Sequence, residues 1–130
     1  MIEKLRAVLC GDPRIAYAIL FGSSAWGPMH PHSDVDVAIG VMDAARFDPI
    51  DLGELVSRLE AGAGRPVDLV LLDEAPPGLA YRVFRDGRTI VARDERALKT
   101  RRARAILEYL DFRPIEELCT RGVLDGAHGR

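Results

Sequence analysis

The feature that most constrains this chain is a pair of short patterns, ten residues apart, between two apolar segments. Gly22-Ser23 follows the apolar run Ile15–Leu20, and Asp34-Val35-Asp36 begins the second segment. An apolar run of this length that ends near a glycine predicts a β-strand. In the second segment acidic and apolar residues alternate, which predicts a strand with both carboxylates on one face and its valines on the other.

Two carboxylates on one face of a strand need a physical reason. Asp34 and Asp36 repel each other and resist burial, and a divalent cation is the usual way to hold them there. Oxygen ligands select a hard ion, magnesium or manganese. Gly22 permits close backbone approach, and Ser23 and Ser24 supply hydroxyls and amides at the start of a short helical turn, which suits a phosphate. The stretch therefore predicts a site for a metal-bound nucleotide.

A third carboxylate lies further along the chain. Residues 66–72 are almost continuously apolar and predict a strand that is central in the sheet. Their one charge, Asp68, is costly in that setting unless it is paired, metal-bound or placed at the mouth of a site. If this strand neighbours the one with Asp34 and Asp36, the three acids converge, as a two-metal phosphoryl or nucleotidyl transfer site requires. A surface carboxylate on an edge strand is the alternative.

The remaining sequence predicts helices and one further strand. Apolar residues at helical spacing and capping residues indicate helices over 2–9, 48–60, 77–84 and 95–111, with Gly62 and Gly64 ending the second and Asp94 capping the fourth. Residues 89–91 predict a brief edge strand, and Pro114 predicts the start of one last turn or helix. We expect one domain over 1–130 of the α/β (α+β) class, with a mixed three- to four-stranded sheet flanked by helices. Its C-terminal helices would span about 94–124, followed by a frayed tail.

The composition sets few limits on function. A chain of 130 residues with 48% hydrophobic and 29% charged residues can bury a core of its own. The net charge of −2 gives no signal for nucleic acid, although residues 82–104 hold nine Arg or Lys against three acids. A solvated helix face with some partner contacts is the favoured interpretation of the basic run, and no nucleic-acid motif accompanies it. The run consists of Arg96, Lys99, Arg101, Arg102 and Arg104.

Location is predicted from what the sequence lacks. The first residues carry an acid and no long apolar run, and no segment reaches the length of a membrane span, so we expect a cytoplasmic protein without membrane contact. Cys10 and Cys119 lie far apart without metal-ligand spacing, and we expect buried free thiols, with a disulfide as the alternative. His30 and His32 are expected to be exposed loop residues, with contact to phosphate or adenine as the alternative.

The combined pattern resembles a known family. Gly22-Ser23, ten intervening residues and Asp34-Val35-Asp36 resemble the nucleotidyltransferase signature of the DNA polymerase β superfamily, and Asp68 fills its third acidic position. The short chain resembles the minimal nucleotidyltransferases, the MNT family. Similarity to the MNT partners of HEPN ribonuclease toxins extends over roughly residues 15–115. It is carried by residues 66–73, the helix start at 75–77, the turn at 85–88 and the segment 109–114.

This resemblance implies an antitoxin that transfers AMP from ATP to a tyrosine of its cognate HEPN toxin and binds that toxin in a complex. It also implies roles for the matched positions. The Gly22–Ser24 turn would hold the triphosphate, with Gly22 and Ser23 as the matching residues. Asp34 and Asp36 would bind magnesium, and Asp68 would complete a site for two ions and help to deprotonate the tyrosine.

One residue departs from the family pattern. Many members have Arg at the position of Trp26, and loss of that cation would weaken triphosphate binding or change how the loop packs. The indole ring either stacks on a base or, in the favoured interpretation, pins the loop to the core. The departure keeps open a toxin-neutralising binding protein with weak or lost catalysis. Transfer to a small-molecule acceptor is a further alternative, disfavoured because such enzymes usually carry an additional helical domain.

Overall fold

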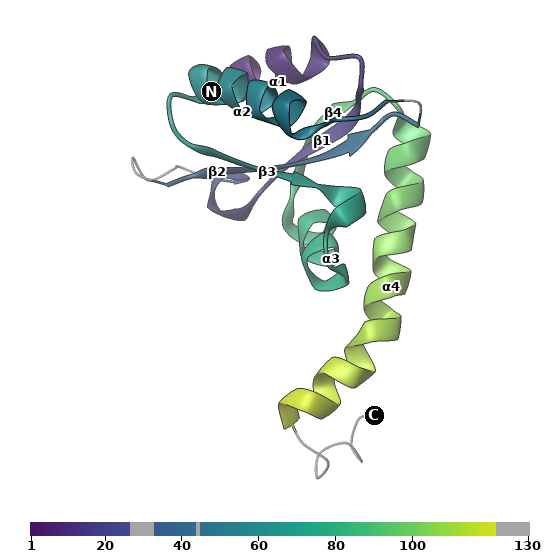
Figure 1. The fold of residues 1–130 in the computed structure, drawn as a ribbon. Coiled ribbons are helices and arrows are strands. Elements are labelled where there is room, and N and C mark those ends of the chain that lie inside the picture. The colour runs from purple at the N-terminus through teal and green to yellow at the C-terminus, as the bar shows by residue number, and fades with distance from the viewer. Residues whose placement is uncertain (27–32, 44, 122–130) are drawn as a thin grey trace.

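The structure is a computed structural model, and it describes the backbone of residues 1–26, 33–43 and 45–121, with their side chains except those of Ser24 and residues 112–121. Helices and strands alternate along most of the chain (Figure 1). The elements are α1 (Ile2–Cys10), β1 (Ile15–Phe21), the 3-10 helix η1 (Gly22–Ser24), β2 (Val35–Val41), α2 (Pro49–Ala63), β3 (Val67–Leu71), the 3-10 helix η2 (Leu72–Glu74), α3 (Pro77–Asp86), β4 (Arg88–Ala92) and α4 (Glu95–Arg121).

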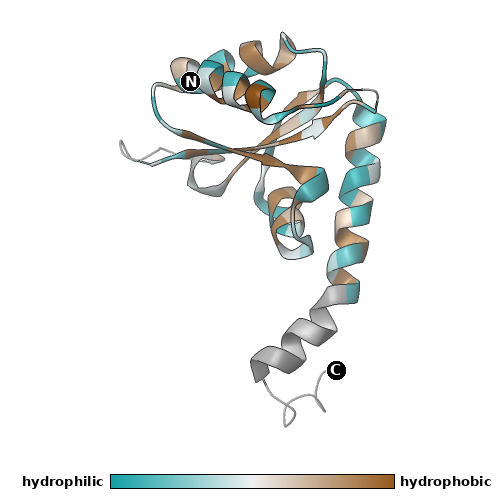
Figure 2. Cartoon of the chain, viewed as in Figure 1, coloured by the Kyte–Doolittle hydropathy of each residue, from teal (hydrophilic) through white to brown (hydrophobic). Residues whose placement is uncertain are grey.

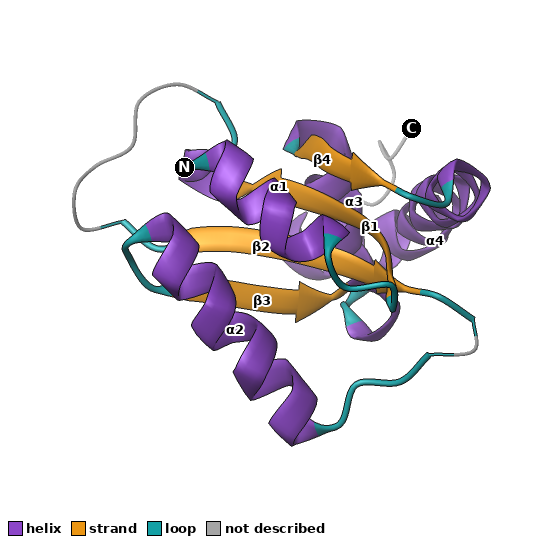
Figure 3. Ribbon diagram, turned by 90° about the horizontal axis from the view of Figure 1, so that it is seen from above, coloured by secondary structure: helices purple, strands orange, loops and turns teal. Residues whose placement is uncertain are grey.

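The described strands form a mixed sheet in the order β3-β2-β1-β4. Strand β1 runs antiparallel to both of its neighbours, whereas β2 and β3 are parallel. Helices α1 and α2 cover one face of the sheet, and α3 and the first part of α4 cover the other (Figure 1, Figure 3). The second part of α4 extends away from the sheet (Figure 1). The predicted α/β class, with a mixed sheet flanked by helices, is confirmed.

Alternation along the strands divides the core into two layers. Val35, Val37 and Ile39 of β2 are fully buried and pack with residues of α1 and α2. Ala38 belongs to the opposite layer, with residues of α3 and α4. In Figure 2 the strands between the helices carry mostly hydrophobic residues, while α2 and α4 alternate between hydrophilic and hydrophobic. Because Asp36 has the same parity as Ala38, it lies on the α3–α4 face, opposite the valines.

Strand β3 lies at the edge of the sheet, so the prediction of a central strand is wrong. Its pairing among the described residues is with β2. Both of its faces are nevertheless covered, because Leu69 and Leu71 pack against the α1–α2 layer and Val70 against the α3–α4 layer. A continuously apolar sequence indicates that both faces of a strand are covered by helices. It does not indicate whether the strand has one neighbouring strand or two.

Most helix predictions are confirmed. Asp94 accepts a hydrogen bond from a backbone amide in the first turn of α4 (3.0 Å), as expected of a cap. Gly64 ends α2 in the left-handed region, with φ +71, whereas Gly62 lies inside the last turn and does not end the helix. The expected break before Pro114 is wrong, since α4 continues through it. Proline removes one intrahelical hydrogen bond, and the neighbouring turns keep this helix continuous.

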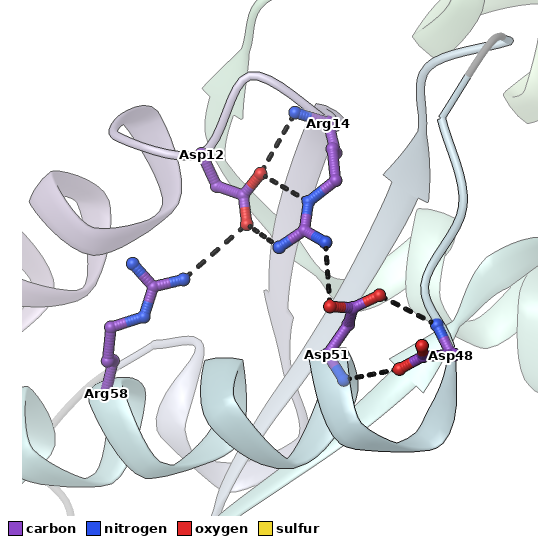
Figure 4. A network of polar contacts seen from close by, with 5 residues as sticks. All are labelled: Asp12, Arg14, Asp48, Asp51 and Arg58. Carbon is purple, nitrogen blue, oxygen red and sulfur yellow. Dashed lines mark hydrogen bonds and ion pairs between the residues drawn. The ribbon is translucent and has the colours of Figure 1, made fainter.

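A charge network fixes the start of α2 against the α1–β1 turn (Figure 4). Asp12 is 4% exposed and accepts hydrogen bonds from Arg14, including 3.0 Å from Nε and 2.8 Å from Nη2. Arg14 also pairs with Asp51 (3.3 Å), which forms a reciprocal capping box with Asp48, and Arg58 approaches Asp12 at 3.6 Å. The hydrogen bond from Arg14 is the main reason that the pKa of Asp12 lies below its ordinary value. The network therefore needs Asp12 ionised.

Candidate functional site

The turn after β1 brings a glycine against Asp36. Gly22 begins η1 and has φ +72. A β-carbon added to Gly22 would lie 2.4 Å from Oδ2 of Asp36. Glycine is therefore required both by the left-handed backbone and by the close approach of the carboxylate. Ser23 follows as an exposed residue, and the side chain of Ser24 lies outside the described part of the structure.

Strand pairing places two of the predicted carboxylates at adjacent positions. Asp36 is in register with Phe21 on β1 and with Asp68 on β3. Residues in register on neighbouring strands project to the same face, so the carboxylates of Asp36 and Asp68 share the α3–α4 face. Asp34 directly precedes β2 and is exposed. The three predicted acids and Gly22 thus lie toward the same end of the sheet.

The electrostatics of Asp36 reflect these neighbours. Its pKa is raised above the ordinary value of 3.8, first because partial burial disfavours the charged form and then because of the negative charges of Asp68 and Asp34. Across the residues that the structure describes, no three His, Cys, Asp or Glu side chains are close enough together to form a preformed metal site. A carboxylate beside two others is still a place where a divalent cation would relieve repulsion. The donor set therefore fits a hard, oxygen-ligated ion.

Trp26 contributes to the site region in a way that the sequence does not reveal. Trp26 is 62% exposed, so the prediction that it pins the loop by packing in the core is wrong. Instead, its indole Nε1 donates a hydrogen bond to the backbone carbonyl of Asp86 at the end of α3 (2.7 Å). The guanidinium carbon of Arg88 lies 5.4 Å from the centroid of the Trp26 ring. These contacts join the Gly-Ser turn to the α3–β4 connection, and only tertiary pairing brings them about.

The basic run on α4 is not a uniformly solvated face. Arg101 is 5% exposed and donates a hydrogen bond to the carbonyl of Leu72 (2.9 Å). It also lies 3.6 Å from Asp73 and 3.9 Å from Glu108. The solvated interpretation is therefore wrong for Arg101, which ties α4 to η2, directly after β3. It holds for the other members, which are exposed: Arg96, Lys99, Arg102 and Arg104.

The predictions for the cysteines, the loop histidines and the C-terminal tail fall partly on residues that the structure describes. Cys10 is free and exposed, which contradicts the expected buried thiol. The side chains of His30, His32 and Cys119, and the predicted frayed tail, lie outside the described residues. Along the ranges that the structure describes, no helix combines the length and apolarity needed to cross a membrane.

A Gly-Ser turn packed against Asp36, which is in register with a second acid on the parallel neighbouring strand of a small mixed sheet, defines the class of protein as a nucleotidyltransferase fold. Comparison with family models agrees with this class. Residues 3–96 match the model described as "Polymerase beta, Nucleotidyltransferase", and the chain belongs to that family. The match spans every residue predicted for the site, from Gly22 to Asp68.

A named relative is the protein adenylyltransferase MntA of Shewanella oneidensis, which is 35% identical over 78 residues. The match covers 60% of this chain and 55% of that protein, so the chain spans little more than half the length of its relative. One similar solved structure is a crystal structure of a toxin-antitoxin with AMP-PNP. It is 25% identical with a TM-score of 0.79, and the match covers 95% of this chain and 98% of that chain.

A further similar structure is that of the tri-AMPylated Shewanella oneidensis HEPN toxin in complex with the MNT antitoxin. The chain matched there is 22% identical with a TM-score of 0.72, and the match covers 95% of this chain and 99% of that one. At this identity the comparison supports the fold alone. The described residues thus have the fold of proteins found in such complexes.

Proposed function

We propose that this protein is an antitoxin that transfers AMP from ATP to a tyrosine of a cognate HEPN ribonuclease toxin and holds that toxin in a complex. Membership of the nucleotidyltransferase family supports the reaction class. The relative named as a protein adenylyltransferase, and the similar chains in toxin-antitoxin structures with AMP-PNP or an AMPylated HEPN toxin, support the substrate and the partner. The proposed setting is the cytoplasm, where ATP is available.

The observation that carries the proposal is the environment of Asp36. This carboxylate is partly buried against Gly22 and faces the charges of Asp34 and Asp68. Such a like-charge cluster at the end of a strand costs stability, and its arrangement is understandable if a cation is bound there during function. In the proposal, Asp34, Asp36 and Asp68 bind two magnesium ions, with manganese as the alternative.

Each part of the site has a proposed role in the transfer. Gly22 and Ser23 bind the triphosphate, with Ser24 beside them, and the left-handed backbone at Gly22 lets the phosphates approach the turn. Bound divalent ions would neutralise the triphosphate and stabilise the leaving pyrophosphate. Asp68 is exposed and can accept the proton of the incoming tyrosine hydroxyl. The tyrosine oxygen then attacks the α-phosphorus of ATP, and pyrophosphate leaves.

Intact-mass analysis tests the proposal directly. The protein is incubated with ATP, magnesium and its candidate HEPN toxin, which is sought in the adjacent reading frames, and the mass of the HEPN protein is then measured. We expect the mass to rise by one or more AMP units, and the rise to disappear with Asp34→Asn or Asp36→Asn. Asp111→Asn, an exposed carboxylate on α4, is the matched control and should leave the rise intact.

Other outcomes favour the alternatives. A tight complex without a change in mass would favour neutralisation by binding alone, with Trp26 the first residue to examine. If the HEPN protein neither gained mass nor bound, the toxin would be the wrong acceptor, and transfer to a small molecule would be tested next. Full transfer with magnesium by either Asp34→Asn or Asp36→Asn would refute the assignment of the metal ligands.

A further inference from the structure

We propose that Arg88 binds the triphosphate of ATP and that the ring of Trp26 holds the Arg88 guanidinium in place. This inference rests on the proposed nucleotidyl transfer and deepens it, because it names a residue on β4 as part of the nucleotide site. The sequence patterns end at Asp68 and contain no cation, whereas a triphosphate carries several negative charges. A cation near the Gly-Ser turn is therefore expected on electrostatic grounds.

Strand pairing brings Arg88 to the Gly-Ser turn. Arg88 is the first residue of β4 and is in register with Leu20 on β1, two positions before Gly22. Its side chain therefore leaves β4 on the α1–α2 face, as that of Leu20 does, whereas Asp36 lies on the other face. Arg88 can meet the nucleotide only at the end of the sheet that both faces share, beside the Gly-Ser turn. The connection before it is tightly packed, since a β-carbon on Gly87 would lie 3.2 Å from the carbonyl oxygen of Leu20. The start of β4 thus lies beside the end of β1, where the turn begins.

The guanidinium of Arg88 lies over the ring of Trp26, four residues after Gly22. The backbone of η1 and of Ala25 is helical, so Trp26 follows Gly22 by about one turn, roughly 6–8 Å along the chain. The indole is anchored by its hydrogen bond to the carbonyl of Asp86, and the guanidinium of Arg88 lies over its ring at 5.4 Å. A cation over an aromatic face is held in orientation while its edge N–H groups remain available.

The charges around Arg88 leave it available for an anion. Asp86, the nearest acid along the chain, is engaged by Arg85 through two hydrogen bonds of 3.0 and 2.8 Å. Among the described residues, no carboxylate forms an ion pair with Arg88, and its guanidinium lies over the ring of Trp26. Arg88 is a half-buried residue, and a guanidinium without a carboxylate partner is suited to bidentate contact with phosphate oxygens.

Binding of two probes tests this inference. One probe is magnesium-ATP, and the other is magnesium tripolyphosphate, which has the phosphates and lacks the base. Affinity is measured by calorimetry on the full-length protein without toxin. Trp26 is the one tryptophan of the chain, so its fluorescence follows the same titration from inside the proposed site. We expect Arg88→Ala to weaken both probes by about tenfold or more, and Arg88→Lys to weaken them less.

Matched variants separate this role from a structural one. Arg102 is an exposed arginine over an aromatic ring, 5.8 Å from the centroid of Phe84, and Arg102→Ala should change affinity by less than twofold. Trp26→Phe keeps an aromatic face and loses the hydrogen bond to Asp86, so it should retain more of the affinity than Trp26→Ala and less than the wild type. If Arg88→Ala lowers the melting temperature, Arg88→Gln, which keeps a polar side chain of similar bulk, replaces it.

The outcomes distinguish this inference from the proposed function. If the wild type binds ATP, and Arg88→Ala and Arg88→Gln bind it with the same affinity, the role of Arg88 is overturned. The proposed reaction would then still stand. Loss of ATP binding alone, with tripolyphosphate unaffected, would also overturn it and would assign the Trp26–Arg88 pair to the base. A wild-type protein that bound neither probe would overturn both proposals.

Discussion

Replacing Asp36 with asparagine should stabilise the metal-free protein while it abolishes transfer. Asparagine has nearly the same shape, so the change mainly removes one negative charge. In the folded state that charge lies between those of Asp34 and Asp68, and partial burial adds to its cost. Function and stability should therefore change in opposite directions at this one position.

The register of the strands gives the magnitude. Adjacent strands are about 4.8 Å apart, so two unit charges at paired positions such as Asp36 and Asp68 repel by about 1 kcal/mol in a water-like dielectric and by about 3 kcal/mol at an effective dielectric constant near 20. Asp68 is exposed, which favours the lower figure. For a chain of 130 residues, about 1 kcal/mol corresponds to a rise in melting temperature of about 4 °C.

The dependence on pH has a definite sign. Because the pKa of Asp36 is raised in the folded state, its favourable contribution is complete below its ordinary pKa of 3.8 and is lost as the pH rises through the raised pKa. The stability advantage of Asp36→Asn should therefore be small at acid pH and should reach its full value near neutral pH. At low pH the Asp36 carboxyl group is protonated and neutral, and asparagine is also neutral. The two proteins should therefore have similar stability there.

Thermal melts in a chelator and in excess magnesium measure both effects. In the chelator Asp36→Asn should melt above wild type, and Asp111→Asn, the control on α4, should match wild type. Magnesium should raise the melting temperature of wild type and leave that of Asp36→Asn nearly unchanged. A variant that melted below wild type in the chelator, or that responded to magnesium as wild type does, would refute the reasoning.

Three further predictions concern neighbouring residues. Asp68→Asn should lower the rate of transfer more than it lowers ATP affinity, since the proposed proton acceptor is lost while the Gly-Ser turn is kept; single-turnover kinetics separate the two. Gly22→Ala should destabilise by about 1–3 kcal/mol in urea denaturation, because its β-carbon would collide with Asp36 at a positive φ. Asp12→Asn should cost about 2 kcal/mol at neutral pH, because the network in Figure 4 loses its central charge.

Each of these has its own check. A loss confined to ATP affinity in Asp68→Asn would contradict its role toward the acceptor. Gly53→Ala, at a helical glycine with open space around its β-carbon, should be neutral or stabilising and serves as the control for Gly22→Ala. Since the pKa of Asp12 is lowered in the folded state, its contribution is present above 3.8 and is lost as the pH falls. A cost of Asp12→Asn that stayed constant down to strongly acid pH would be inconsistent with that account.

Local patterns in the sequence were sufficient for the elements and for part of the site. Alternation of acids and valines predicted which face of β2 carries Asp36, and the structure agrees. Periodicity and capping residues predicted the starts of α2 and α4, because these signals act within a few residues of one another. The spacing between the Gly-Ser turn and the acids also belongs to one continuous stretch, so sequence alone could indicate a metal-nucleotide site.

Tertiary structure decided the features that depend on which strands pair. An apolar strand is the same in sequence at the centre or the edge of a sheet, so only the fold placed β3 at the edge and Asp68 in register with Asp36. The burial of Arg101 and the contact of Arg88 with Trp26 likewise join residues that are distant along the chain. Local propensities act over a few residues, whereas these contacts are set by the packing of the whole sheet between its helices.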